Sequence, residues 1–179
     1  MIMDNYKSVS LDKTAAELVC VMGEQRLEGF VAELKRKNLT LATAESCTGG
    51  LVGKLLTDVS GVSAVYLGGV ICYTNDIKIN ILGVSEHTIK EYTEVSAQTA
   101  VQMAQGVREK FASNIGVSVT GFAGPDGGTE NNPVGTVYIA VATSNETRVL
   151  RLSLDGEMGR GEIRRTSAHV IFAMIKKII

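Results

Sequence analysis

Helical and extended sequence patterns alternate along most of this chain, and that alternation constrains the fold more than any other feature. Helical spacing of apolar residues predicts helices over 11–37 with a break near Gly23, from Gly50 to about Asp58, and over 96–111 (capped by Ser96) and 160–179. The segments 75–82 and 85–92 are predicted to be short helices or turns. Short apolar or alternating runs predict strands over 39–43, 65–73, 115–120, 134–142 and 148–154. The sequence therefore predicts an α/β fold with three α/β/α layers around a mixed, mostly parallel sheet.

Two regions of the predicted sheet carry further information. The run over 65–73 is nearly all apolar, which is expected of a strand that is covered on both faces. Gly68-Gly69 inside this run indicates a close approach of two backbones or a bulge. The runs over 134–142 and 148–154 flank a turn at Ser144-Asn145, so they predict a hairpin.

Charge and composition exclude several classes of protein. The 18 Lys and Arg nearly balance the 19 Asp and Glu, which argues against a general nucleic-acid binder. No apolar run approaches the ~18 residues that a membrane span needs, and the first ten residues lack the apolar core of a signal peptide, so we expect a cytoplasmic protein. The three cysteines form no CxxC pair, so no structural zinc site is expected, and Cys20 and Cys72 are interpreted as buried small apolar residues.

The first glycine turn, 45–50, lies between a predicted strand and a predicted helix. Ser46 stands where free backbone N–H groups and the helix dipole favour an anion. From the residues alone it is a nucleophile, a phosphate ligand or an N-cap, and capping is the commonest role of a serine before a helix. The segment does not fit the nucleophile elbow, because Ala44 and Thr48 stand where that motif has glycines.

A serine nucleophile needs a base, and the two histidines are poor candidates. His87 and His169 lie in helical segments without an obvious orienting carboxylate, which favours structural or surface roles. Tyr73 ends the predicted strand 65–73, and Lys78 lies in the turn that follows. A partly buried lysine with a lowered pKa can deprotonate a serine, although a surface lysine is the commoner case.

The second glycine loop follows the predicted strand 115–120. It begins with Thr120-Gly121 and continues through Gly124, Gly127 and Gly128. Glycines allow backbone N–H groups to converge on a phosphate or an oxyanion, but a plain surface loop has the same composition. Arg160, at the start of the last predicted helix, is either a phosphate clamp or an ordinary exposed arginine.

Taken together, these motifs resemble one family, the C-terminal domain of CinA-like proteins, whose stand-alone members are nicotinamide-nucleotide amidases. The resemblance covers roughly residues 25–178 and rests on five ordered motifs, namely TAESCTGG (43–50), LGGVICYTN (67–75) with Lys78, LGV (82–84), VTGFAGPDGGT (119–129) and PVGTVYIA (133–140). It implies that 25–179 form an amidase domain and that 1–24 are an N-terminal helical extension. It also implies a homodimer.

The resemblance implies a reaction without metal or cofactor, the hydrolysis of nicotinamide mononucleotide to nicotinic acid mononucleotide and ammonia in pyridine-nucleotide salvage. Position by position, it implies that the catalytic residues are Ser46 as nucleophile, Tyr73 and Lys78 as groups that handle its proton, and Thr120. The implied substrate-binding residues are Glu45, Thr48, Gly49, Gly50, Gly121, Gly124, Gly127, Gly128 and Arg160. Cys47 is expected to pack inward beside Ser46.

This sequence departs from the family pattern before the last helix. The family usually has Gly-Asp-Arg there, whereas this chain has Met158-Gly159-Arg160 and so lacks an acidic partner for the arginine. A non-catalytic paralogue that binds pyridine nucleotides is therefore an alternative to the amidase. A third class, a DNA-associated competence factor, is disfavoured by the balanced charge.

Overall fold

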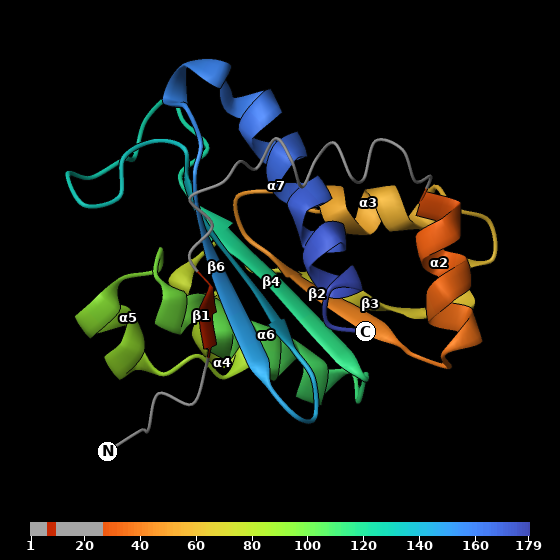
Figure 1. Cartoon of the computed structure of the whole chain (residues 1–179). Helices are drawn as coiled ribbons and strands as arrows, with labels where there is room; N and C mark the ends of the chain where they lie inside the picture. The colour runs from red at the N-terminus through yellow and green to blue at the C-terminus, as the bar shows by residue number, and fades with distance from the viewer. Residues whose placement is uncertain (1–6, 10–26) are drawn as a thin grey trace.

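The computed structural model describes residues 7–9 and 27–179 and is shown in Figure 1. A six-stranded sheet lies at its centre, with the strand order β1-β6-β5-β4-β2-β3. The strands are β1 (Lys7–Val9), β2 (Leu41–Glu45), β3 (Tyr66–Ile71), β4 (Ile115–Gly121), β5 (Thr136–Ala142) and β6 (Thr147–Ser153). Strand β2 pairs in parallel with β3 and β4, β1 pairs in parallel with β6, and β5 is antiparallel to both β4 and β6. The predicted mixed, mostly parallel sheet is confirmed.

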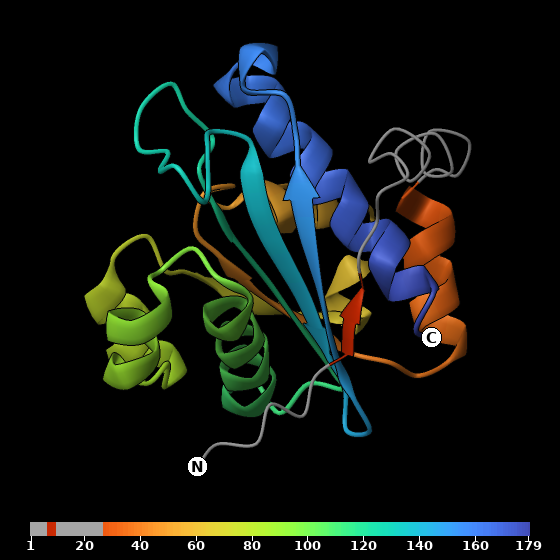
Figure 2. The ribbon, with the colours of Figure 1, turned by 60° about the vertical axis from the view of Figure 1, so that its left-hand side comes forward.

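The helices cover both faces of this sheet, as Figures 1 and 2 show. They are α2 (Leu27–Arg36), α3 (Leu51–Thr57), α4 (Asn75–Leu82), α5 (Glu86–Tyr92), α6 (Ala97–Lys110) and α7 (Arg160–Lys176), with short 3-10 turns η1 (Val62–Ala64) and η2 (Gly156–Met158). Helices α2, α3 and α7 share one hydrophobic core with the sheet, while α4 and α6 pack against its other face. The three layers predicted from the alternating patterns are therefore present.

The two faces of the sheet differ in the size of their side chains. Val117, Val119 and Ile139 point into the large core beneath α7, where Phe30 of α2 packs on Phe172. The α6 face carries small residues instead, which are Ala42, Ala44, Ser118, Ala140 and Ala142. A Cβ at Gly116 would lie 2.1 Å from the Ala104 carbonyl oxygen, so α6 packs closely against β4.

The prediction that 65–73 is covered on both faces is wrong. Strand β3 lies at the edge of the sheet, and its residues alternate between half-buried and exposed. Leu67 and Ile71 are 43% and 58% exposed, respectively. The close approach predicted at the glycines is confirmed, because a Cβ at Gly69 would lie 2.1 Å from Thr43 Oγ1 and the pairing with β2 shifts register at Leu41/Ala42.

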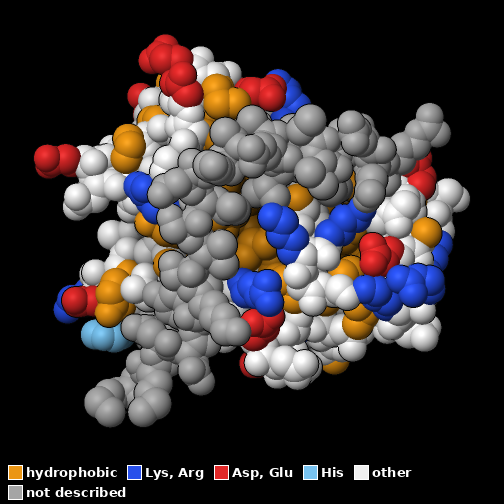
Figure 3. Space-filling model, viewed as in Figure 1, with side chains coloured by type: hydrophobic (Ala, Val, Ile, Leu, Met, Phe, Trp, Pro, Cys, Tyr) orange, Lys and Arg blue, Asp and Glu red, His pale blue; other side chains and the backbone are white. Residues whose placement is uncertain are grey.

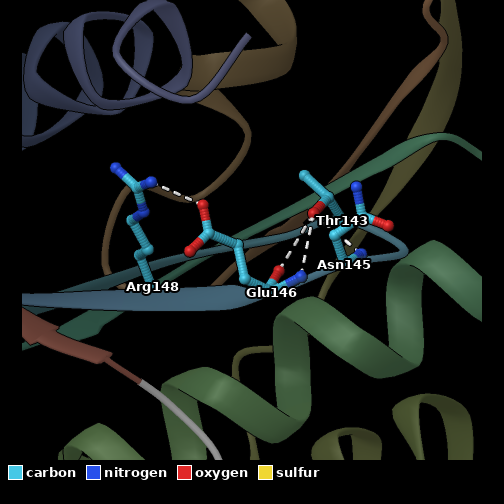
Figure 4. A network of polar contacts seen from close by, with 4 residues as sticks. All are labelled: Thr143, Asn145, Glu146 and Arg148. Carbon is cyan, nitrogen blue, oxygen red and sulfur yellow. Dashed lines mark hydrogen bonds and ion pairs between the residues drawn. The ribbon is translucent and has the colours of Figure 1, made fainter.

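Local hydrogen bonds explain where several elements begin and turn. Ser96 caps α6, as predicted, because its side chain accepts a hydrogen bond from the Thr99 N–H. The hairpin of β5 and β6 is also confirmed. Figure 4 shows that the Thr143 hydroxyl accepts from the N–H groups of Asn145 and Glu146, which closes the turn.

The N-terminal predictions are tested only in part. The three described residues of the predicted helical extension, Lys7–Val9, form a strand rather than a helix. The rest of that extension and the predicted break near Gly23 lie outside the described residues. No helix in 7–9 and 27–179 is long and apolar enough to cross a membrane. On the face seen in Figure 3, acidic as well as basic side chains are present.

Candidate active site

Ser46 lies directly after β2, where the central parallel strands end. Its N–H donates a hydrogen bond to the Val119 carbonyl of β4, at 3.0 Å. On the other side, the Cys72 N–H donates to the Glu45 carbonyl at 2.8 Å. These two bonds extend the sheet pairing past the last strand residue, so the backbone around Ser46 is held from both sides. The carboxyl ends of parallel strands are where ligands of α/β sheets bind.

Lys78 reaches this point from α4. Thr74 caps that helix by accepting from the Ile77 N–H, and Lys78 follows in its first turn. The Lys78 Nζ lies 3.2 Å from Ser46 Oγ and 2.8 Å from the Cys72 carbonyl oxygen. The Lys78 side chain is 1% exposed, and this burial lowers its pKa, while Cys72 and Glu94 partly oppose the shift. The structure thus brings together Ser46, which the family resemblance implies as nucleophile, and Lys78, one of the two groups that it implies handle the proton.

The lowered pKa of Lys78 predicts a pH-dependent contribution to stability. Between the pKa in the folded protein and the value of about 10.4 in the unfolded chain, the unfolded state binds more protons, so the free energy of unfolding rises with pH. A Lys78→Met variant lacks this slope. Urea denaturation of both proteins from pH 7 to 10 measures it, and the wild-type free energy minus that of the variant should rise with pH. A difference that stays flat or falls contradicts the burial of this amine.

Tyr73 and Arg160 lie together at the rim. Tyr73 is 60% exposed, and its hydroxyl accepts a hydrogen bond of 3.1 Å from Arg160 Nη2. Arg160 Nη1 donates to the Gly124 carbonyl oxygen at 2.8 Å. Among the described residues, Tyr73 makes no hydrogen bond to Ser46 or Lys78, so of the two predicted proton-handling groups only Lys78 contacts the serine.

Arg160 follows Met158-Gly159, where the family pattern has an acidic residue before the arginine, and its partners agree with that difference. Within the described part of the chain, Arg160 takes part in no ion pair, and both of its hydrogen-bond acceptors are neutral oxygens. Its positive charge is therefore not neutralised by a carboxylate. An exposed guanidinium in this state is available to an anionic group.

These residues surround a cavity of about 190 Å³. Its lining consists of Ser46, Cys47, Tyr73, Lys78, Glu94, Val95, Thr120, Gly121, Phe122, Ala123, Asp126 and Arg160. Glu94, Val95, Phe122, Ala123 and Asp126 were not identified as site residues from the sequence. Glu94 and Val95 lie between α5 and α6, where no sequence motif marks a site. Asp126 was visible only as a member of the glycine loop.

Thr120 lies at the wall of the cavity and is 1% exposed. Its hydroxyl donates to the Glu94 carbonyl oxygen at 2.7 Å. The hydroxyl proton is therefore already used, and the bond ties the end of β4 to the segment before α6. This geometry does not fit Thr120 as an oxyanion donor, although Thr120 does line the cavity.

The expectation that the first glycine turn offers a free helix N-terminus is wrong. The Glu45 carboxylate accepts hydrogen bonds from the Thr48 hydroxyl and from the N–H groups of Gly50, Val52 and Gly53, at 2.8–3.0 Å. Glu45 and Thr48 are 2% and 0% exposed and do not line the cavity. Gly49 and Gly50 do not line it either. The chain supplies its own anion at α3, so these N–H groups are occupied and the four residues do not contact this cavity, while Glu45 and Gly50 line a separate cavity of about 320 Å³.

The second glycine loop contributes less than predicted. Gly121 lines the cavity, and Gly124 contributes its carbonyl oxygen to Arg160. Gly127 and Gly128 do not line the cavity, and Cβ atoms there would meet Phe122 and the backbone of Val134, respectively. At Gly127 and Gly128 the loop packs on its own Phe122 and on the chain before β5.

The remaining cysteine and histidine side chains that the structure describes show no feature of a nucleophile or a base. Cys47 and Cys72 are buried, and burial raises the pKa of these thiols to about 12 and about 11, respectively. Cys20 lies outside the described residues. His87 is exposed and His169 is half-buried, and neither lines the cavity. In 7–9 and 27–179 no group of His, Cys, Asp and Glu side chains is arranged to hold a metal ion.

Comparison with known proteins places this geometry in a family. The profile described as the CinA C-terminal domain matches residues 24–179. A CinA-like protein of Kosmotoga olearia is 41% identical over 164 residues, which are 91% of this chain and 39% of that protein. A CinA-like protein of Fervidobacterium nodosum is 43% identical over 162 residues, or 90% of this chain and 39% of the relative. The chain thus spans about two fifths of the length of these curated relatives.

Solved structures agree with this assignment. The competence/damage inducible protein CihA from Agrobacterium tumefaciens is 36% identical with a TM-score of 0.80, and the match covers 91% of this chain and 94% of that one. A CinA superfamily protein from Escherichia coli is 26% identical with a TM-score of 0.79, over 100% and 99% of the two chains. The sequence resemblance and the fold therefore lead to the same result: this chain belongs to the family of the CinA C-terminal domain.

Proposed function

We propose that this chain is an amidohydrolase that converts nicotinamide mononucleotide to nicotinic acid mononucleotide and ammonia. The observation that carries the proposal is the 3.2 Å contact between Lys78 Nζ and Ser46 Oγ at a cavity of about 190 Å³. An amide is a poor electrophile, so its hydrolysis needs an activated nucleophile and a protonated leaving amine. A serine beside a buried lysine meets both needs.

In the proposed reaction, neutral Lys78 takes the proton of the Ser46 hydroxyl as Oγ attacks the carboxamide carbon. In the structure Lys78 Nζ donates to Ser46 Oγ and to the Cys72 carbonyl oxygen; the neutral amine can keep its N–H bond to Cys72 while its lone pair accepts the Ser46 proton. The tetrahedral intermediate collapses when the Lys78 ammonium gives its proton to the leaving nitrogen, which departs as ammonia. Water then hydrolyses the Ser46 ester, with Lys78 again as the base, and releases the carboxylate.

The negative charge that develops on the carbonyl oxygen needs a donor. The N–H of Cys47 follows the nucleophile and belongs to a residue that lines the cavity, so it is the candidate for this role. Tyr73 is assigned a role at the rim, because its hydroxyl contacts Arg160 rather than the serine. Phe122, which lines the same cavity, is a flat apolar surface for a pyridine ring.

Arg160 is proposed to hold the phosphate of the nucleotide, since its charge lacks a carboxylate partner among the described residues. We expect Arg160→Ala to raise KM by roughly 10- to 100-fold with a small change in kcat, because a charge-assisted contact to a remote group is lost. Steady-state kinetics on nicotinamide mononucleotide measure this. Arg165→Ala is the control, because Arg165 lies on the same helix but is exposed and pairs with Glu162. A fall in kcat alone would contradict the assignment.

The proposal is tested by incubating the purified chain with nicotinamide mononucleotide and measuring ammonia and nicotinic acid mononucleotide. Equal amounts of both products support the amidase. Binding without ammonia release supports the alternative, a non-catalytic pyridine-nucleotide-binding paralogue. Salt-dependent affinity for DNA, with neither ammonia release nor nucleotide binding, would favour a DNA-associated role. The homodimer and the cytoplasmic location stay predictions.

A further inference from the structure

Glu45 is a buried carboxylate that the proposed reaction does not use. It is 2% exposed, and both of its oxygens accept hydrogen bonds, Oε1 from the Gly53 N–H and Oε2 from the Thr48 hydroxyl and two further N–H groups. Among the described residues it takes part in no ion pair. All of the hydrogen bonds of its side chain therefore lie within the turn and first helical residues that follow Ser46.

Helix α3 has no N-cap side chain that accepts a hydrogen bond. The N-cap is Gly50, which has no side chain to accept a hydrogen bond and a positive φ of 95°. The first turn also contains no acidic residue. Glu45 supplies the missing acceptor from the last position of β2. A local Ser or Asp cap would satisfy the same N–H groups, but only a residue placed before the turn connects strand and helix across the nucleophile.

The backbone of Glu45 connects the same residue to Lys78. The Glu45 carbonyl accepts from the Cys72 N–H at 2.8 Å, and the Cys72 carbonyl accepts from Lys78 Nζ at 2.8 Å. Lys78 Nζ in turn lies 3.2 Å from Ser46 Oγ, and Ser46 follows Glu45 in the chain. These contacts form a closed ring through Glu45, Cys72, Lys78 and Ser46. The Glu45 carboxylate connects this ring to the first residues of α3.

We propose that Glu45 is a positioning residue, whose carboxylate holds the turn 46–50 so that the Ser46 hydroxyl stays within reach of the Lys78 amine. This inference rests on the proposed function. It makes Glu45 part of the geometry of the reaction without contact to the substrate, and it differs from a helix cap that contributes stability alone. The distinction matters because reaction rates are far more sensitive than stability to displacements of about 1 Å.

The test is Glu45→Gln, which keeps the length and shape of the side chain but turns one acceptor into an NH₂ group that faces N–H donors. We expect kcat on nicotinamide mononucleotide to fall roughly 10- to 100-fold while KM stays within about 3-fold. The control is Asn114→Ala. Asn114 Oδ1 accepts from the N–H and the hydroxyl of Thr40, so the variant removes a comparable anchor at the opposite end of the sheet. It should leave kcat unchanged.

A second readout does not depend on the substrate. A fluorophosphonate reagent should modify Ser46 in the wild type and do so roughly 10- to 100-fold more slowly in Glu45→Gln. Labelling without turnover of the nucleotide would refute the proposed substrate while still testing Glu45. If Glu45→Gln does not fold, Thr48→Val removes one donor to the carboxylate and should slow labelling by a smaller factor. Equal labelling rates and equal kcat, after correction for the folded fraction, would overturn the inference.

Discussion

Replacement of Ser46 by Ala is expected to reduce ammonia release from nicotinamide mononucleotide by about 10⁴-fold or more, because the only atom removed is the proposed nucleophile. The rest of the cavity keeps its lining, including Arg160 and Lys78. Binding of the nucleotide, measured by calorimetry, should therefore stay within about 3-fold of the wild type. Loss of turnover together with intact binding is the result that assigns Ser46 to the chemistry.

Ser167→Ala is the matched control for this variant. Ser167 is another buried serine, but its hydroxyl donates to the Ile163 carbonyl inside α7 and does not line the cavity. Turnover should be unchanged in the folded fraction of this control. A Ser46→Ala protein that turns over at the wild-type rate, or that loses binding together with turnover, would contradict the role assigned to Ser46.

Replacement of Lys78 by Met is expected to have the second largest effect, a fall of kcat by roughly 10²- to 10⁴-fold. Methionine fills the space of the lysine side chain but can neither accept the Ser46 proton nor donate one to the leaving amine. The wild-type rate should fall with decreasing pH as Lys78 becomes protonated, and this decline should occur below the ordinary pKa of lysine because burial lowers it.

The pH profile of kcat/KM separates this role from a structural one. Lys78→Met should lose the acidic decline as well as the rate. The control is Lys54→Met, because the Lys54 side chain is 64% exposed and pairs with Asp58 on the surface of α3. It should keep both the rate and the profile. A Lys78→Met protein with nearly full activity would leave the serine without its proposed base and contradict the mechanism.

Most of the fold could be predicted because its elements carry strong local signals. The helical period over 96–111 and the alternation over 115–120 were sufficient to place α6 and β4. The edge position of β3 could not be predicted from its composition. An apolar run can have the same composition in an edge strand and in a central strand. Only the strand order of the whole sheet decides which of the two positions it takes.

The candidate site, like the fold, could be predicted from the sequence only in part. The motifs around Ser46 and Lys78 were visible in the sequence, but the residues alone favoured a helix cap and a surface lysine, and only the family resemblance pointed to catalytic roles. The role of Glu45 could not be predicted, because it depends on where N–H groups of α3 point after folding. Glu94 enters the cavity through a loop without a motif, and it is held there by Thr120 from a strand 26 residues away in the chain.

The most direct test of the central claim is to add hydroxylamine during turnover of nicotinamide mononucleotide. If Ser46 forms an ester with the nicotinoyl group, ammonia leaves before water attacks. Hydroxylamine then competes with water for the ester, and the hydroxamate of the nucleotide should appear at the expense of the carboxylate while ammonia release continues. Formation of the carboxylate alone at every hydroxylamine concentration would contradict attack by the Ser46 hydroxyl and favour direct attack by water.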